Sequence, residues 1–267
     1  MSLLDQRSAT LNWDSPPSTG QIRAHYSGHG YIAYQAPRFA MVLNMLKRYI
    51  GPDSRVLDVG RTVLTDMISA IFKRPVDSLG FEPDAQIDGA HHYHFDLNAA
   101  QNPEAWRRDL PGYDVIIFAE VLEHLHTAPN LVLGFLKSLL NPNGVLILQT
   151  PNAAAIGRRL KMLAGKNPFE LIREDVTDPG HFREYTADEL RKFGRTLGFA
   201  VGDLEFGHWV DLRYKFDAMS RPNQSRPVAP KRGLGYRLHG SGLTNLFYQM
   251  LPGSLRTGLT IVFRRVD

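Results

Sequence analysis

Between residues 55 and 152, short apolar runs alternate with stretches in which apolar residues recur at helical spacing. Five runs predict strands: "RVLDVG", "VDSLGFEPD", "HHYHFDLN", "YDVIIFAEVLEH" and "VLILQTPN". Residues 63–72 and "PNLVLGFLKSLL" predict helices between them, and the turn signal "NPNG" ends the second helix. Buried strands that alternate with helices are typical of a parallel sheet covered on both faces. We therefore predict an α/β fold with a Rossmann-like, doubly wound sheet.

The flanking parts of the chain predict fewer elements. "APRFAMVLNMLKRYIG" predicts a lead-in helix, and Thr186 with Glu189 forms a capping box that starts the helix "TADELRKFGRTLGF". "FAVGDLEFGHWV" and "LTIVFRRV" predict a sixth and a closing strand, "LTNLFYQMLPGSLRTG" a helix as far as Leu251, and residues 213–242 a basic loop. The predicted organisation is a lead-in and helix (1–50), a core (51–210), and a loop, helix and closing strand of the same domain (211–267).

Composition excludes several classes of protein. Hydrophobic residues make up 43% and charged residues 22% of the chain, which is ordinary for a globular protein. The absence of cysteine excludes disulfides, a thiolate nucleophile and a cysteine-based zinc site. The chain starts without a secretion signal and has no run of about 18 apolar residues, so we expect a cytoplasmic protein. A net charge of +4 permits an acidic substrate or a peripheral membrane contact, and we expect no nucleic-acid partner.

Four predicted strands end near a carboxylate: Asp58, Glu82, Asp96 and Glu120. Parallel strands present their carboxyl ends at one edge of a sheet, where ligands of such folds bind, so these side chains should share a site. Carboxylates disfavour a pyrophosphate and favour a cationic ligand rich in hydroxyl groups. Glu82 follows Gly60 by about twenty residues, the spacing at which a carboxylate binds ribose hydroxyls. S-adenosylmethionine combines such hydroxyls with an adenine amino group and an ammonium group.

The strand blocks, together with "HFREYTADELRKFGRTLGF", resemble the class I S-adenosylmethionine-dependent methyltransferases, in particular the branch whose fourth strand runs into E-V-L-E-H. The resemblance covers roughly residues 50–205. It implies a seven-stranded, mostly parallel sheet with an antiparallel last strand, and S-adenosylmethionine as the cofactor. It also implies which residues contact each part of the cofactor: Asp58 and Gly60 the methionine portion, Glu82 the ribose, Asp96 and Leu97 the adenine, and Glu120 the sulfonium.

The first loop departs from this family, whose members usually have G-x-G-x-G where this chain has "GRTVL" after the first strand. Only Gly60 matches the pattern. Arg61 could pair with the cofactor's carboxylate, and Thr62 could cap the following helix while presenting its hydroxyl to the same group. We predict that this variant loop still binds the cofactor, because Glu82, Asp96 and Glu120 are all in place.

Methyl transfer to a hydroxyl benefits from a general base, since the hydroxyl proton must leave. The candidates are His124, oriented by Glu123, and His181 at the start of "HFREYT". The alternatives remain open: His124 could cap the next helix or fill the sheet edge, and His181 could make a structural hydrogen bond to the loop after the fifth strand. His92 and His94 face one way on a strand, but no third ligand lies nearby in the sequence, so we expect a solvated strand and no metal.

The favoured function is O-methylation of a small-molecule, sugar or lipid-linked glycan acceptor. The basic stretches "GRRLKMLAGK" and "PKRGLGYRLHG" would suit an anionic glycan or a phospholipid surface, although such stretches are usually solvated faces. One alternative is a non-catalytic relative that binds a partner protein. Another is a nicotinamide-dependent oxidoreductase, for which the glycine fingerprint is missing. The sequence predicts neither the acceptor nor the oligomeric state.

Overall fold

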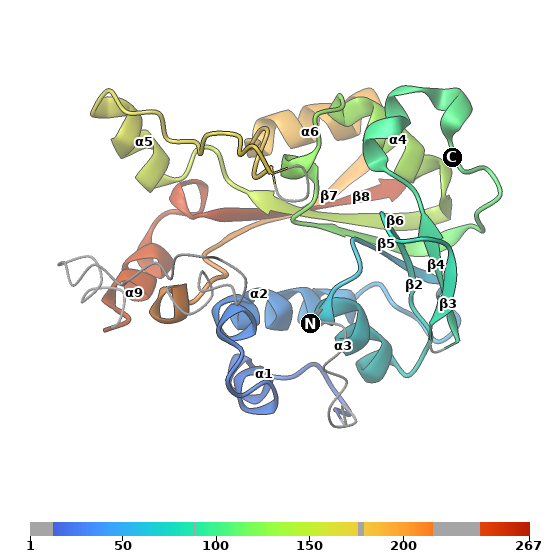
Figure 1. The fold of residues 1–267 in the computed structure, drawn as a ribbon, viewed down its shortest axis with the longest axis horizontal. Coiled ribbons are helices and arrows are strands. Elements are labelled where there is room, and N and C mark those ends of the chain that lie inside the picture. The colour runs from blue at the N-terminus through green and yellow to red at the C-terminus, as the bar shows by residue number, and fades with distance from the viewer. Residues whose placement is uncertain (1–12, 88, 176–178, 216–240) are drawn as a thin grey trace.

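The computed structural model describes residues 13–87, 89–175, 179–215 and 241–267, which form one mixed sheet with helices on both faces (Figure 1). Its strands are β1 Val56–Val59, β2 Asp77–Gly80, β3 Ala85–Ile87, β4 Ala90–His94, β5 Tyr113–Ala119, β6 Leu140–Pro151, β7 Phe199–Gly207 and β8 Gly258–Arg265. Their order across the sheet is β3-β4-β2-β1-β5-β6-β8-β7. The five strands β4, β2, β1, β5 and β6 run parallel to one another. Strand β8 is antiparallel to both β6 and β7. The predicted α/β, Rossmann-like sheet is confirmed.

The predicted count of seven strands is wrong, because the sheet has eight. The additional strand is β3, which pairs antiparallel with β4 at the edge of the sheet. Gly89, with φ of 81°, has the left-handed backbone conformation that suits the reversal between these two strands. The three residues "AQI" are too short and too exposed to give an apolar pattern, so only the pairing with β4 identifies them as a strand.

Helices cover the two faces of the sheet in separate groups (Figure 1). The group α1 Thr19–His25, α2 Gly30–Leu46 and α3 Val63–Phe72 lies on one face, and α4 Pro129–Ser138 and α6 Ala187–Thr196 lie on the other. Two hydrophobic clusters correspond to these layers: Val115 and Ile117 of β5 pack toward α2 and α3, whereas Ile116 and Phe118 pack toward α4. This alternation is expected of a strand that is buried on both faces.

Two further helices, α5 Ile156–Leu163 and α9 Leu243–Met250, lie at the carboxyl end of the parallel strands (Figure 1). Short 3-10 helices complete the described structure: η2 Leu97–Gln101, η3 Pro103–Ala105, η4 Leu122–His124, η5 Leu212–Tyr214 and η6 Gly253–Leu255. Most of the predicted basic loop 213–242, including "PKRGLGYRLHG", lies outside the described residues. In the part of the chain that is described, no helix has the length and apolarity needed to cross a membrane.

The lead-in helix α2 starts six residues before the sequence pattern predicts, and Pro37 lies inside it. Proline removes one backbone hydrogen bond from a helix and normally marks a boundary. Here apolar residues on both sides of the proline, including Ile32 and Phe39, are buried in the same cluster. Burial of these side chains against the sheet therefore outweighs the local preference.

Capping boxes start both helices that frame the candidate site. Thr62 precedes α3 and accepts a hydrogen bond from the Leu64 N–H, while Thr65 accepts one from the Thr62 N–H at 3.0 Å. Thr186 and Glu189 form the predicted capping box of α6. These reciprocal hydrogen bonds satisfy backbone donors that a helix start otherwise leaves unpaired.

Replacement of Gly194 by alanine should destabilise the packing of α6 on β8. The added Cβ would lie 2.5 Å from Cε1 of Phe263, whose ring is fully buried. We expect the free energy of unfolding, measured by urea denaturation, to fall by about 1–3 kcal/mol. The matched control is Gly134→Ala in α4, where the nearest atom is 3.6 Å away and stability should stay equal or rise slightly. Equal stability of the two variants would contradict this packing.

Candidate active site

The parallel register of β4, β2, β1 and β5 brings the four predicted carboxylates to one edge of the sheet. Asp58 is the residue before the last one of β1, Glu82 follows β2, Asp96 follows β4, and Glu120 follows β5 directly. Glu82 is exposed. Asp96 caps η2 by accepting a hydrogen bond from the Asn98 N–H at 2.9 Å. Each carboxylate therefore lies at the position that the strand pattern predicts for it.

Leu97, predicted beside the adenine, is part of the hydrophobic core and is almost fully buried. Its side chain supports the segment that carries Asp96.

The loop after β1 has one position where only glycine fits. Gly60 has φ of 83°, and a Cβ there would lie 3.3 Å from Cγ2 of Val121. Its N–H donates to the carbonyl oxygen of Leu79 in β2, which fixes the bend between β1 and α3. A tight bend, a glycine that allows close approach and a following capped helix start fit the methionine end of S-adenosylmethionine.

Arg61 has a partner within the protein. Its guanidinium is mostly buried and donates to Asp66 at 2.9 Å. Its pairing with the cofactor's carboxylate stays a prediction. Thr62 occupies its predicted cap position and is exposed to solvent. An ion pair between Arg61 and Asp66 therefore holds the loop to the first turns of α3.

Asp58 is buried beneath this loop. Its Oδ2 accepts a hydrogen bond from the Thr65 hydroxyl at 2.6 Å, and Arg38 and Arg61 supply positive charge nearby. Burial nevertheless dominates and raises the pKa of Asp58 to about 7. A cationic ligand at this position would favour the charged form of the carboxylate.

Glu120 is held in an unusual backbone conformation at the end of β5. Its φ is 58°, which is uncommon for a residue with a side chain, and its N–H donates to the carbonyl oxygen of Gln149 at 2.8 Å. Burial raises the pKa of Glu120, and the positive charge of Arg38 opposes this effect. Burial together with Glu120 raises the pKa of Tyr34 to about 12. Helix α2 therefore brings a cation and a phenol close to Glu120.

Arg38 is a residue of the site that the sequence pattern does not indicate. It is 7% exposed, and its Nε donates to Gln35 at 2.9 Å. The available signal is an arginine inside the otherwise apolar stretch "APRFAMV", because such a charge is rarely buried without a partner. The carboxylates near it, Asp58 and Glu120, are distant in the chain, so the pattern alone does not identify them.

Glu123 is fully buried below Glu120. Its Oε2 accepts a hydrogen bond from the Thr150 hydroxyl at 2.9 Å, and its Oε1 has no hydrogen-bond partner among the described residues. Burial and the charge of Glu120 raise the pKa of Glu123 well above its usual range. Glu123 is the predicted orienter of His124, but the Nδ1–H of His124 donates to the carbonyl oxygen of Gly180 at 2.9 Å.

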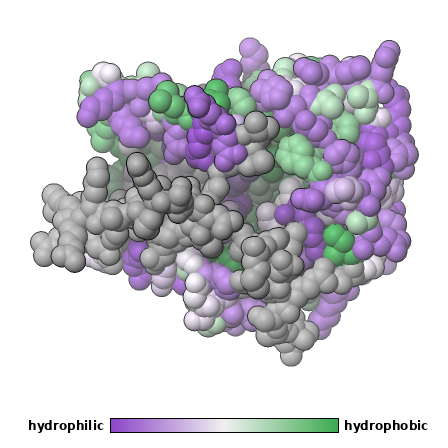
Figure 2. All heavy atoms as spheres, viewed as in Figure 1, coloured by the Kyte–Doolittle hydropathy of each residue, from purple (hydrophilic) through white to green (hydrophobic). Residues whose placement is uncertain are grey.

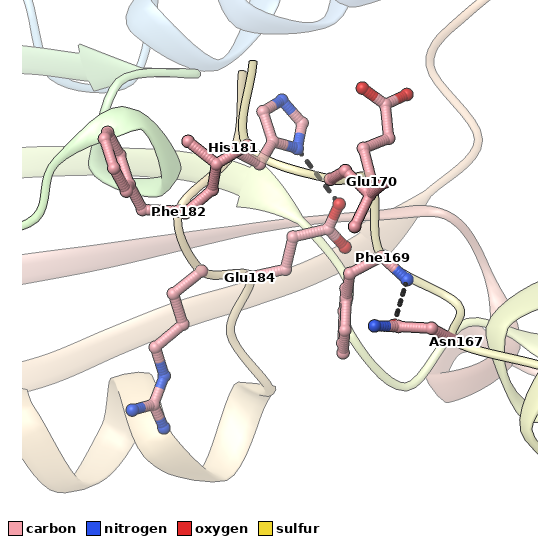
Figure 3. Close-up of a pocket in the computed structure, with 9 residues that line it drawn as sticks. Asn167, Phe169, Glu170, His181, Phe182 and Glu184 are labelled. Atoms are coloured by element: carbon pink, nitrogen blue, oxygen red, sulfur yellow. Dashed lines mark hydrogen bonds and ion pairs between the residues drawn. The ribbon is translucent and has the colours of Figure 1, made fainter. Parts of the chain in front are cut away.

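The two predicted histidines meet, although 57 positions separate them in the chain. The ring centroids of His124 and His181 lie 4.7 Å apart with an interplanar angle of 85°. Nδ1 of His181 lies 3.0 Å from Oε1 of Glu184, and Figure 3 shows the ring and the carboxylate pointing toward one another. The predicted alternative for His181, a structural hydrogen bond to the loop after the fifth strand, is replaced by this pair.

Glu184 connects His181 to α5 through an ion pair with Arg158. Burial acts to raise the pKa of Glu184, but hydrogen bonds from His181 and Arg158 together with their charges outweigh it and hold the pKa below its usual value. The carboxylate is therefore an anion that accepts a hydrogen bond from the Nδ1–H of His181. This leaves Nε2 as the ring nitrogen with a lone pair. Glu184 was missed in the sequence, where its position three residues after His181 is the only signal.

A pocket of about 680 Å³ opens beside His181. One wall consists of His181, Phe182 and Glu184, and the facing wall is the segment 167–172 (Figure 3). Phe169, Leu171 and Ile172 give this facing wall an apolar surface. The pocket therefore offers a polar end at the histidine and an apolar side.

Three donor groups at this edge could also hold a metal ion. One ligand atom from each of Glu123, His124 and His181 lies within 4.8 Å of the others. The histidines of β4 are not part of this group. His92 is buried with its Nδ1 2.8 Å from the Ser78 hydroxyl, so the prediction of a solvated strand is wrong for this residue.

Comparison with known proteins identifies the family. The model of the methyltransferase domain family matches residues 31–204, so the chain belongs to this family of enzymes. No curated protein sequence matches the chain.

Solved structures share the fold at low sequence identity. Coclaurine N-methyltransferase, bound to N-methylheliamine and S-adenosylhomocysteine, superimposes with a TM-score of 0.52 and 15% identity over 84% of this chain and 72% of its own. A putative sarcosine dimethylglycine methyltransferase from Galdieria sulphuraria superimposes with a TM-score of 0.50 and 13% identity. The match covers 86% of this chain and 84% of that protein. The expected resemblance to S-adenosylmethionine-dependent methyltransferases is confirmed, and S-adenosylmethionine is the cofactor of this class.

The buried carboxylate of Asp58 should make stability depend on pH. Its pKa is about 7 when folded and about 3.8 when unfolded, so the folded state retains a proton that the unfolded state releases. The contribution of this residue to folding is therefore present below about pH 4 and is lost as the pH rises to about 7. The loss is on the order of 4 kcal/mol. Asp58→Asn should remove this slope in urea denaturation across that range, and parallel slopes for both proteins would contradict the assignment.

Proposed function

We propose that the enzyme transfers a methyl group to a hydroxyl of a sugar, of a lipid-linked glycan or of another small acceptor that has a polar and an apolar part. The observation that carries the proposal is the contact of His181 with His124 and Glu184, at the edge of the sheet that also holds Glu120. The neighbouring pocket, polar at His181 and apolar along segment 167–172, supports the choice of acceptor.

The carboxylate edge would hold the cofactor. Glu82 accepts hydrogen bonds from ribose hydroxyls, Asp96 with Leu97 borders the adenine, and Asp58 with the Gly60 bend binds the methionine end. When bound there, S-adenosylmethionine supplies an electrophilic methyl group on a sulfonium. Glu120 is half-buried and close to Arg38, so it adds negative charge beside that cation where water screens it only in part.

His181 is the general base of the proposal. Its Nε2 would take the proton of the acceptor hydroxyl while the hydroxyl oxygen bonds to the methyl carbon and displaces the sulfur, so that S-adenosylhomocysteine leaves. Glu184, held by Arg158, keeps the proton on Nδ1 and stabilises the imidazolium that results. His124 packs against the edge of the same ring and limits its orientations. Alignment of the acceptor and exclusion of water supply the remainder of the rate increase.

A divalent cation is a second candidate for the same place, and one observation favours it. Oε1 of Glu123 is buried without a hydrogen-bond partner among the described residues. Glu123 also belongs to the donor group with His124 and His181. Nδ1 of each histidine already contacts an oxygen atom, which is the arrangement that orients metal-ligating imidazoles. A cation there would bind the acceptor hydroxyl and lower its pKa, in place of the base.

Cofactor binding tests the proposed carboxylate edge. Glu82→Ala should weaken the binding of S-adenosylhomocysteine at least about fivefold in calorimetry, because a charge-assisted hydrogen bond to ribose is lost. The matched control is Asp53→Ala, which removes an exposed carboxylate before the amino end of β1 and should leave affinity unchanged. Equal affinity of wild type and Glu82→Ala would exclude the ribose assignment.

The reaction rate distinguishes catalysis by a general base from catalysis by a divalent cation. With an acceptor found in a panel of free sugars, phenols and lipid-linked sugars, His181→Ala should reduce the rate of S-adenosylhomocysteine release about 10²- to 10⁴-fold and leave affinity for S-adenosylhomocysteine unchanged. His126→Ala removes an exposed histidine nearby and is the control. The wild-type rate should not change with a metal chelator. Loss of the rate in chelator and its recovery with added divalent cation would establish the second candidate instead.

A further inference from the structure

Two helices at the carboxyl end of the sheet expose apolar side chains that the core does not use. Helix α5 has no buried residue, and Leu160, Met162 and Leu163 are all exposed, Leu163 to 84%. Ile156, Leu160 and Leu163 recur at the i, i+4, i+7 spacing that places them on one face of the helix. This face therefore has the pattern of a packed helix without a packing partner among the described residues.

The segment that follows α5 extends the apolar surface. Leu171 and Ile172 are exposed, Leu171 to 86%. They belong to the wall of the pocket beside His181, so the apolar surface continues from α5 to the mouth of that pocket. Figure 2 shows hydrophobic atoms among hydrophilic ones at the end of the molecule where α5 lies.

Helix α9 adds a second exposed apolar face next to α5. The hydroxyl oxygen of Tyr248 lies 3.3 Å from the position that a Cβ of Gly157 would occupy, so the two helices are neighbours. Phe247 and Met250 are exposed, Met250 to 77%, and α9 carries no charged residue. We call α5, segment 166–173 and α9 together the apolar end.

Basic residues accompany the apolar side chains of this end. Helix α5 contains Arg158, Arg159 and Lys161 and no acidic residue, and Lys166 follows it. Arg158 is paired with Glu184, whereas Lys161 and Lys166 are exposed. The acidic residues of this region come later in the chain, and Glu170 among them is paired with Arg173. Exposed aliphatic side chains beside lysines are the features of helices that lie in the interface of an anionic bilayer.

We propose that the apolar end docks on the surface of a membrane that contains anionic lipid. The leucines and methionines of α5 and α9 would enter the boundary between headgroups and acyl chains, while Lys161 and Lys166 remain at the level of the lipid phosphates. Docking in this orientation turns the mouth of the His181 pocket toward the lipid surface. That consequence for a lipid-linked acceptor rests on the proposed function, whereas the docking does not.

The test is flotation of the purified full chain with vesicles of phosphatidylcholine, with or without phosphatidylglycerol, in the absence of cofactor and acceptor. We expect binding to the anionic vesicles that weakens as salt is added. The double variant Leu163→Glu, Met250→Glu should reduce this binding at least about tenfold, because two apolar contacts with the acyl boundary are lost. The matched control is Val266→Glu, which alters an exposed apolar residue outside the apolar end and should bind as wild type does.

The charge contribution is tested separately. Lys161→Glu with Lys166→Glu should weaken binding to anionic vesicles at least about fivefold and leave the weak binding to neutral vesicles unchanged. Affinity for S-adenosylhomocysteine, measured on each variant, verifies that it is folded and tests cofactor binding independently of the membrane. Absence of wild-type binding to anionic vesicles, or equal binding of wild type and the apolar double variant, would overturn the proposal. So would a wild-type dimer in solution that the double variant converts to a monomer, since the apolar end would then bind a second copy.

Discussion

Burial of negative charge at one edge of the sheet is the constraint on which the candidate site depends. Asp58, Glu120 and Glu123 lie at the ends of neighbouring strands or just beyond them. Asp58 and Glu123 are buried, and Glu120 is half-buried. Transfer of a carboxylate out of water costs several kcal/mol unless a cation, hydrogen bonds or a proton compensates. Arg38 and the Thr65 and Thr150 hydroxyls supply part of this compensation. A cationic ligand such as a sulfonium would supply the rest of the compensation.

This constraint gives the lead-in helix a functional role. Helix α2 packs its apolar side chains under β1 and β5, and the same packing fixes Arg38 and Tyr34 near Glu120. A helix that looks like an accessory in the sequence therefore completes the charge balance of the site. Pro37 inside the helix does not prevent this, because the buried side chains on either side hold it in place.

The histidine pair depends on a different part of the fold. His124 follows β5 in the helix η4, whereas His181 and Glu184 belong to the segment before α6. The N–H of Phe182 donates to the carbonyl oxygen of Glu123 at 2.8 Å, and the Nδ1–H of His124 donates to the carbonyl oxygen of Gly180. These two backbone contacts hold the segments together and bring the imidazole rings into contact. Arg158 of α5 then couples the pair to the end of the molecule that bears the exposed apolar surface.

The sequence by itself determined the strands β1, β2 and β4 to β8, the capping boxes of α3 and α6, and the strand-end positions of Asp58, Glu82, Asp96 and Glu120. Periodicity and cap residues are local signals, so a single sequence carries them. It did not determine the edge strand β3, the extension of β6 through the turn signal "NPNG" with Asn143 in a left-handed conformation, or the start of α2.

Tertiary structure alone decided the partner of each charged side chain: Asp66 for Arg61, Glu184 for His181 and for Arg158, and Glu120 near Arg38. Such pairs join residues whose separation in the chain has no fixed period, and burial sets their strength. The chain fixes the order of its elements, but only their packing fixes which charges meet away from water.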